Sequence, residues 1–201
     1  MCIRDSFNNR AAFTDPEVLR SSLASVILRM KSLKLDDIEQ FPFVEAPPGR
    51  AVADGYHLLQ ELGAIELASA SDDDGEASRT GASFVLTETG HELAKLPVDP
   101  RIGRMILAAR EHQCLSEMLI IASALSVQDA RDRPMQEREA AEAAHAKFAD
   151  DKSEFISFLK LWRWYGEQVQ HKASQRKLVN LLRQNFLSPI RLREWHDVHT
   201  Q

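Results

Sequence analysis

Cysteine is nearly absent from the 201-residue sequence, which contains only Cys2 and Cys114. Two cysteines so far apart exclude a disulfide framework and a cysteine-based zinc site. Long hydrophobic runs are also missing, because no apolar stretch approaches the roughly 20 residues that span a bilayer. The first residues lack the basic start and the apolar stretch of a secretory signal. We therefore expect a cytoplasmic protein without a membrane partner.

The sequence also lacks the motifs of common self-contained enzymes. It has neither a glycine-rich phosphate loop of the Walker type nor a Gly-x-Ser-x-Gly nucleophile elbow. The segment that starts with His91 and Glu92 begins like a zinc-protease helix, but Lys95 stands where the second histidine must bind the metal. His196 and His199 form a pair without an obvious third ligand. We expect no catalytic residue, no cofactor and no metal in this chain.

Excess positive charge is missing as well, since the formal net charge is −5. A protein that binds nucleic acid through its overall field needs clustered lysine and arginine. One local stretch does have them, with Glu194 as its single acid: Lys172, Arg176, Lys177, Arg183, Arg191 and Arg193. The stretch is typical either of a solvated helix face or of a local phosphate-binding surface.

Two helices and a hairpin are predicted in the first half. Thr14, Asp15 and Pro16 start a helix whose apolar residues recur as far as Met30, and a second helix follows a proline-rich connector and ends at Gly63. Residues 64–67 and 84–87 have the composition of short strands, and the segment between them, 69–83, is polar and acidic. This order favours a winged helix over residues 14–98.

A helical bundle is predicted in the second half. Pro97 and Pro100 cannot lie inside one continuing helix, so we expect a boundary there. Residues 129–134 indicate a loop before another helix. Apolar residues recur at helical spacing in four segments, 102–109, 118–125, 155–162 and 178–186. The fold class is therefore mainly α, with a winged helix followed by an α-helical bundle over residues 99–201.

The boundary carries a family resemblance. Residues 90–107, from Gly90 through Ala94, Pro97 and Pro100, resemble the junction between the winged-helix and ratchet domains of DEAH-box RNA helicases. Residues 114–129 resemble the next helix of this family, with an ending of the HrpA type. Further similar segments follow the family order: 16–20, 62–65, 155–162, 185–188 and 191–195.

The resemblance implies that the chain is an internal fragment of a bacterial HrpA-type helicase. Residues 1–13 do not resemble the preceding RecA-like domain, so we interpret them as a truncated or foreign segment. Gln201 falls where the family continues into an OB-fold. The implied parent is an ATP-dependent 3′–5′ RNA helicase whose motor domains, missing here, bind ATP and magnesium. Its partners would be single-stranded RNA and the RecA-like motor and OB-fold of the same polypeptide.

The resemblance places this piece next to the motor, as part of the channel for single-stranded RNA. Arg183, Arg191 and Arg193 are the first candidates for phosphate contacts, followed by Lys172, Arg176 and Lys177. Salt bridges within the bundle are the alternative role for each arginine. Trp164 is a candidate for stacking on a base, whereas Trp162 falls on the apolar stripe of its helix.

Two other functions remain open. A free-standing winged-helix regulator would read duplex DNA with a recognition helix. The helix over residues 52–62 has no lysine or arginine, which disfavours that function. A non-catalytic adaptor that binds protein partners through its bundle is the third hypothesis.

Overall fold

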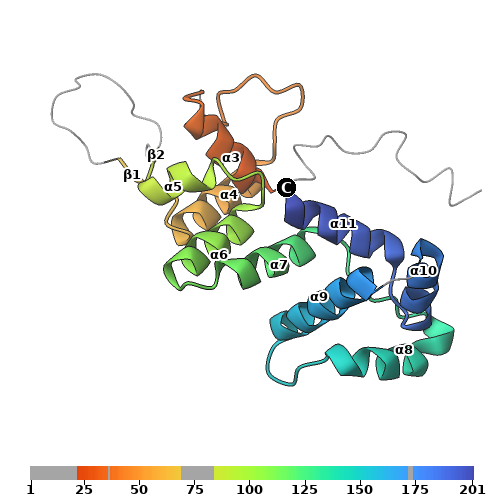
Figure 1. The fold of residues 1–201 in the computed structure, drawn as a ribbon. Helices are drawn as coiled ribbons and strands as arrows, with labels where there is room; N and C mark the ends of the chain where they lie inside the picture. Colours follow the sequence, from red (N-terminus) through yellow and green to blue (C-terminus); the bar gives the residue numbers. More distant parts are fainter. Residues whose placement is uncertain (1–21, 36, 69–83, 172–173) are drawn as a thin grey trace, which may run out of the picture. The chain divides into compact units, whose positions relative to one another are not determined.

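The computed structural model describes residues 22–35, 37–68, 84–171 and 174–201 (Figure 1). Its contacts divide the chain into two compact units, Met1–Arg104 and Met105–Gln201. The start of the first predicted helix, the polar segment 69–83, the segment 1–13 and Lys172 lie outside the described residues. No helix in the described ranges is long and apolar enough to cross a membrane.

The first unit consists of short helices around a two-stranded hairpin. Its elements are α3 (Leu23–Ser32), α4 (Gly49–Glu61), β1 (Ile65–Leu67), β2 (Phe84–Leu86) and α5 (Glu88–Leu93). The strands pair antiparallel, with Ile65 opposite Leu86. Both helices and both strands follow the sequence prediction, whereas α5 was not predicted. The helices and hairpin expected of a winged helix are therefore confirmed.

Glycine shapes α4 at two places. Gly63 has a φ of 67°, and the Ala64 amide donates to the Leu59 carbonyl at 2.8 Å, which ends the helix in the way the sequence predicts. Gly55 faces α3, where an added Cβ would lie 2.8 Å from Ile27 Cδ1. The small residue lets α3 and α4 pack closely, so that Ile27 and Leu59 are buried.

Thr87 and Gly90 fix the start of α5 against the end of α4. The Thr87 hydroxyl donates to the Gly63 carbonyl at 2.6 Å and accepts from the Gly90 amide at 3.0 Å. A Cβ at Gly90 would lie 2.0 Å from the carbonyl oxygen of Ala64. Gly90 is therefore required for packing, because the backbone of α5 meets the backbone of Ala64 at this position.

The second unit is helical. Helix α6 (Pro100–Glu111) crosses the division between the units, and the turns η1 (Met135–Glu137) and η2 (Ala146–Phe148) flank α8. The remaining helices are α7 (Leu115–Ser126), α8 (Arg138–His145), α9 (Glu154–His171), α10 (Gln175–Gln184) and α11 (Pro189–Thr200). The predicted helical bundle is confirmed, and α11 is a further helix that periodicity did not predict.

Trp195 of α11 lies at the centre of this unit. It is 1% exposed, and its indole Nε1 donates to the Ile120 carbonyl at 3.1 Å and to the Ser123 hydroxyl at 3.0 Å. Helix α7 packs against both α9 and α11. The buried cluster comprises Ala124, Ala130, Phe148, Leu161, Leu178, Leu182, Leu187, Leu192 and Trp195.

The loop after α7 is bound to the segment between α10 and α11. Arg131 forms an isolated antiparallel bridge with Leu187, and the Ser188 amide donates to the Ala130 carbonyl at 2.8 Å. The Asp132 amide donates to the Phe186 carbonyl at 2.8 Å. Phe186 itself has a φ of 53°. The loop predicted at residues 129–134 is thus present and is held by backbone hydrogen bonds.

Candidate nucleic-acid interface

Helix α10 carries three of the residues predicted to bind RNA. Arg176 and Lys177 lie in its first turn and Arg183 in its last, and all three are exposed. Their side chains make no hydrogen bond or ion pair with any other residue in the described ranges. Leu178 and Leu182 are buried in the core. Packing of the helix therefore leaves these cations facing solvent.

Because of the helix dipole, a cation has opposite effects on stability at the two ends of α10. Ser174 caps the start, where its hydroxyl accepts from the Lys177 amide at 3.3 Å. The first turn contains no acid, so Arg176 and Lys177 add positive charge to an end that is already positive. Arg183 lies at the opposite end, where a cation is favourable. The start of α10 is therefore a place where an anion would be stabilised.

On α11, Arg191 and Arg193 have different surroundings. Arg191 is 27% exposed and pairs with Asp132; its Nη1 donates to Asp132 Oδ1 at 2.7 Å and to the Asp129 carbonyl at 3.1 Å. Arg193 is exposed and makes no hydrogen bond or ion pair with the described side chains, although its charge acts on the Tyr165 hydroxyl. Two residues along a helix differ by roughly 200° in direction. The two arginines therefore lie on different flanks of α11.

Trp164 is half-buried and packs on neighbouring side chains. Its ring meets Phe148 edge-on at a centroid distance of 5.2 Å, and Lys147 Nζ lies 4.4 Å above its centroid. Lys147 also donates to Asn185 Oδ1 at 2.6 Å. Trp162 packs on Trp195 at 5.0 Å. Both tryptophans thus border the core, so the expected contrast between an open Trp164 and a core Trp162 is small.

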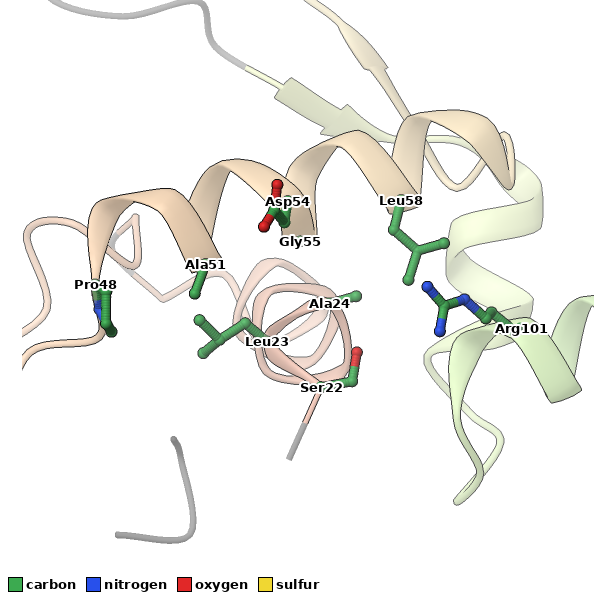
Figure 2. Close-up of a pocket in the computed structure, with 9 residues that line it drawn as sticks. All are labelled: Ser22, Leu23, Ala24, Pro48, Ala51, Asp54, Gly55, Leu58 and Arg101. Carbon is green, nitrogen blue, oxygen red and sulfur yellow. The ribbon is translucent and has the colours of Figure 1, made fainter. Parts of the chain in front are cut away.

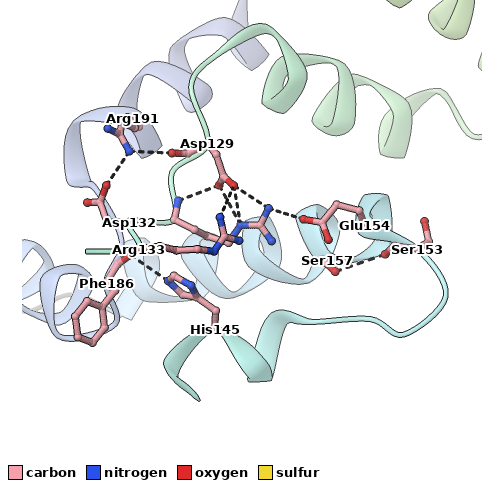
Figure 3. Close-up of polar contacts among 10 residues, drawn as sticks. Asp129, Asp132, Arg133, His145, Ser153, Glu154, Ser157, Phe186 and Arg191 are labelled. Carbon is pink, nitrogen blue, oxygen red and sulfur yellow. Dashed lines mark hydrogen bonds and ion pairs between the residues drawn. The ribbon is translucent and has the colours of Figure 1, made fainter. Parts of the chain in front are cut away.

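Charged groups link the loop after α7 to α9 (Figure 3). Arg131 is 9% exposed and pairs with both Asp129 and Glu154. Arg133 Nη1 lies 3.6 Å from Asp129 Oδ2. Burial would raise the pKa of Asp129, but the hydrogen bonds and charge of Arg131, with the charge of Arg133, lower it overall. Burial likewise opposes the charge of Arg131, yet its two carboxylate partners raise its pKa.

His145 lies beside this network and is 7% exposed. Its Nε2 donates to the Phe186 carbonyl at 3.1 Å, and its Nδ1 has no partner in the described part of the chain. Burial lowers the pKa of His145, and the charges of Arg133 and Arg131 lower it further. A pocket of about 320 Å³ adjoins these side chains. Because its acids are already paired with arginine or lysine, the pocket offers no uncompensated charge.

The first unit has its own pocket of about 320 Å³ between α3 and α4 (Figure 2). Leu23, Ala24 and Leu58 make its walls apolar, and Asp54 and Arg101 stand at its edge. On α4 the exposed polar residues include Asp54, His57, Gln60 and Glu61. Helix α4 begins before the predicted segment and carries one exposed cation, Arg50, beside the acids Asp54 and Glu61. Its net charge is therefore not basic, which still disfavours a helix that reads duplex DNA.

Arg163 is an exposed cation that the sequence analysis missed. It lies on α9, outside the basic stretch from Lys172 to Arg193, and makes no hydrogen bond or ion pair with the residues that the structure describes. Its charged neighbours on the helix surface are one base and one acid, Lys160 and Glu167, so no cluster of like charge marks it in the sequence. Among the described residues, no group of three or more His, Cys, Asp or Glu could hold a metal ion.

Comparison with known proteins finds two family models along the chain. Residues 56–98 match the helicase associated domain (HA2), winged-helix, and residues 99–160 match the helicase associated domain (HA2), ratchet-like. The two matches adjoin between residues 98 and 99. Their order agrees with the predicted winged helix and ratchet-like bundle.

Individual relatives match the whole chain. It is 47% identical over 205 residues to the ATP-dependent RNA helicase HrpA of Escherichia coli and, at the same identity, to an HrpA homolog of Haemophilus influenzae. A DExH-box ATP-dependent RNA helicase of Arabidopsis thaliana, DExH1, is 33% identical over 92% of the chain. The chain spans 15% of the length of each bacterial relative and 17% of the plant one.

Proposed function

Because this chain belongs to the helicase associated domain (HA2) family of HrpA-like DEAH-box helicases, we propose that it is an accessory region of an RNA helicase and forms part of its channel for single-stranded RNA. The bacterial relatives are named ATP-dependent RNA helicases. In the proposed role the chain holds RNA while other parts of the polypeptide supply the motor. It performs no covalent chemistry itself.

The observation that carries this proposal is the set of exposed cations without internal partners on α10 and α11. Arg176, Lys177, Arg183 and Arg193 belong to it. Arg176 and Lys177 lie at the positive end of the α10 dipole, where their charges destabilise the helix. An RNA phosphate near that end would be attracted by the side chains and by the helix amides.

Arg191 enters the proposal in a different way. One of its nitrogens is used by Asp132 and the Asp129 carbonyl, but a guanidinium has five N–H donors. The side chain can therefore stay bound to the loop and still present donors to a phosphate. Lys172 and Trp164 remain predicted RNA contacts, the first outside the described residues and the second half-buried.

The proposal places the motor in other parts of the parent polypeptide. ATP and magnesium would bind to its RecA-like domains, because the 201 residues here contain no phosphate loop. Movement in the 3′–5′ direction and an OB-fold after the bundle are expected from the family. RNA would pass between the motor and the second unit, where the cations of α10 and α11 contact its backbone.

Binding of a fluorescein-labelled oligoadenylate, measured by anisotropy at several salt concentrations, tests the proposal. Each phosphate contact contributes roughly 0.7 to the slope of log affinity against log salt for single strands. The double variant Arg183→Ala/Arg193→Ala should lower the slope by about 1.4. Adding Arg191→Ala should bring the total loss to about 2 if that side chain also contacts phosphate.

Arg138→Ala serves as the matched control, because Arg138 is exposed on α8 and pairs with Glu142. Its slope should equal that of the wild type. An unchanged slope in the folded double variant would mean that these arginines do not contact RNA. Preferential binding of duplex DNA would support the winged-helix regulator instead, and failure to bind either nucleic acid would leave the protein-binding adaptor.

A further inference from the structure

Gly166 has no structural reason within the described fold. It lies in the interior of α9, where glycine destabilises a helix relative to alanine. A Cβ added at Gly166 would meet no atom within 4 Å, whereas one at Gly55 or Gly90 would meet an atom closer than 3.0 Å. Packing therefore explains the other two glycines but not Gly166. Glycine also serves where a ligand must approach the backbone closely.

The side chains around Gly166 are suited to such a ligand. On a helix its surface neighbours are the residues three and four positions away, which here are Trp162, Arg163, Val169 and Gln170. Trp162 and Val169 are half-buried against the core, and Arg163 and Gln170 are exposed. We call the surface formed by Trp162, Arg163, Gly166 and Gln170 the Gly166 face. It combines an aromatic ring, a free cation and an amide around bare backbone.

The ring of Trp162 is held in place by three rings of α11. His199 lies 4.7 Å from it between centroids, and His196 stacks on it at 5.9 Å with an interplanar angle of 20°. Trp195 adds a third contact at 5.0 Å. A ring supported in this way loses little rotational freedom when a ligand packs against its remaining surface.

We propose that the Gly166 face seats a nucleobase of single-stranded RNA, which lies on the bare backbone and against Trp162 while Arg163 contacts the adjoining phosphate. Aromatic surfaces beside cations are the usual means of binding single strands without regard to sequence. The inference rests on the proposed function and extends it to α9, which lies outside the basic stretch. The glycine is then explained, since a methyl group at position 166 would occupy the space of the base.

Gly166→Ala in the full chain tests this inference through two effects of opposite sign. The variant should unfold at a higher urea concentration than the wild type, because alanine favours the helix and its methyl group meets nothing. It should bind a labelled oligoadenylate about five-fold more weakly or worse, with the salt slope unchanged. A purely structural glycine would show the gain in stability without the loss of affinity.

Gly49→Ala is the matched control, because Gly49 of α4 is also helical and its added Cβ meets nothing within 4 Å. It should leave RNA binding unchanged. Arg163→Gln should lower the salt slope by about 0.7. The inference is overturned if Gly166→Ala binds like the wild type or is less stable, or if Arg163→Gln keeps the wild-type slope.

The outcomes separate this inference from the proposed function. If Arg183→Ala/Arg193→Ala loses slope while Gly166→Ala and Arg163→Gln bind normally, the proposed function stands and the Gly166 face is wrong. If the wild type binds no RNA even at low salt, both are wrong. If Gly166→Ala weakens the binding of a protein partner and leaves RNA binding unchanged, the surface is a protein interface and the inference also fails.

Discussion

At Gly90 the backbone of α5 lies against the carbonyl oxygen of Ala64, which leaves no room for a side chain. Gly90→Ala should lower the free energy of unfolding by about 3 kcal/mol, because backbone atoms cannot move aside as a side chain can. Urea denaturation followed by circular dichroism measures the change. Gly166→Ala is the comparison, with an expected gain of up to about 1 kcal/mol. A Gly90 variant as stable as the wild type would contradict the close approach.

Protonation of His145 should weaken the second unit in acid. The folded protein keeps the imidazole neutral, because burial and the charges of Arg133 and Arg131 lower its pKa below the ordinary value of 6.5. Between the two pKa values the unfolded chain therefore binds more protons than the folded chain. Stability should fall as the pH drops below about 6.5 and should not depend on His145 above it.

The measurement compares the wild type with His145→Gln, using urea unfolding from about pH 8 to about pH 5. The variant should show a smaller decline in acid. His199 also has a pKa lowered by burial and by His196, and it is present in both proteins, so the difference isolates His145. Parallel pH profiles would show that His145 does not titrate between the two states.

The loop after α7 is an element held largely by charge. Arg131→Met should destabilise the protein by about 2–4 kcal/mol, since it leaves Asp129 partly buried with Arg133 as its remaining cation in the described network. It also removes the guanidinium from the face of Phe158, which lies 5.2 Å away. Denaturation at low and high salt measures both the loss and its electrostatic part.

Arg138→Met is the matched control for that variant. Its pair with Glu142 is exposed on both sides, so the change should stay within about 0.5 kcal/mol. Equal effects of the two substitutions would mean that the Arg131 network adds no more stability than a surface ion pair.

Elements with a periodic apolar pattern could be predicted from the sequence, and those fixed by distant partners could not. Helices α4, α7, α9 and α10 follow their leucine and isoleucine spacing, and Gly63 marks the end of α4. Helix α5 has six residues, too few to show a period. Arg191 pairs with Asp132, 59 positions away, and no local pattern indicates such a partner. The candidate site was predicted incompletely for a similar reason, because Arg163 of α9 lies outside the basic stretch and no cluster of like charge marks it.

The whole chain should have no ATPase activity. It contains no phosphate loop, and motor chemistry depends on positioned phosphates and magnesium. Phosphate release assayed with and without single-stranded RNA should equal the rate of a buffer blank. RNA-stimulated release that survives further purification would show that the chain contains a motor site.

The Phe186 carbonyl accepts from two donors, the Asp132 amide and His145 Nε2. Loops between helices often act as hinges, because a few of their residues absorb large changes in φ and ψ. Here the Phe186 carbonyl already accepts two hydrogen bonds, so bending between α10 and α11 would break both of them. Helices α10 and α11 should therefore move together with α8 and with the loop after α7, because the Phe186 carbonyl joins all of them.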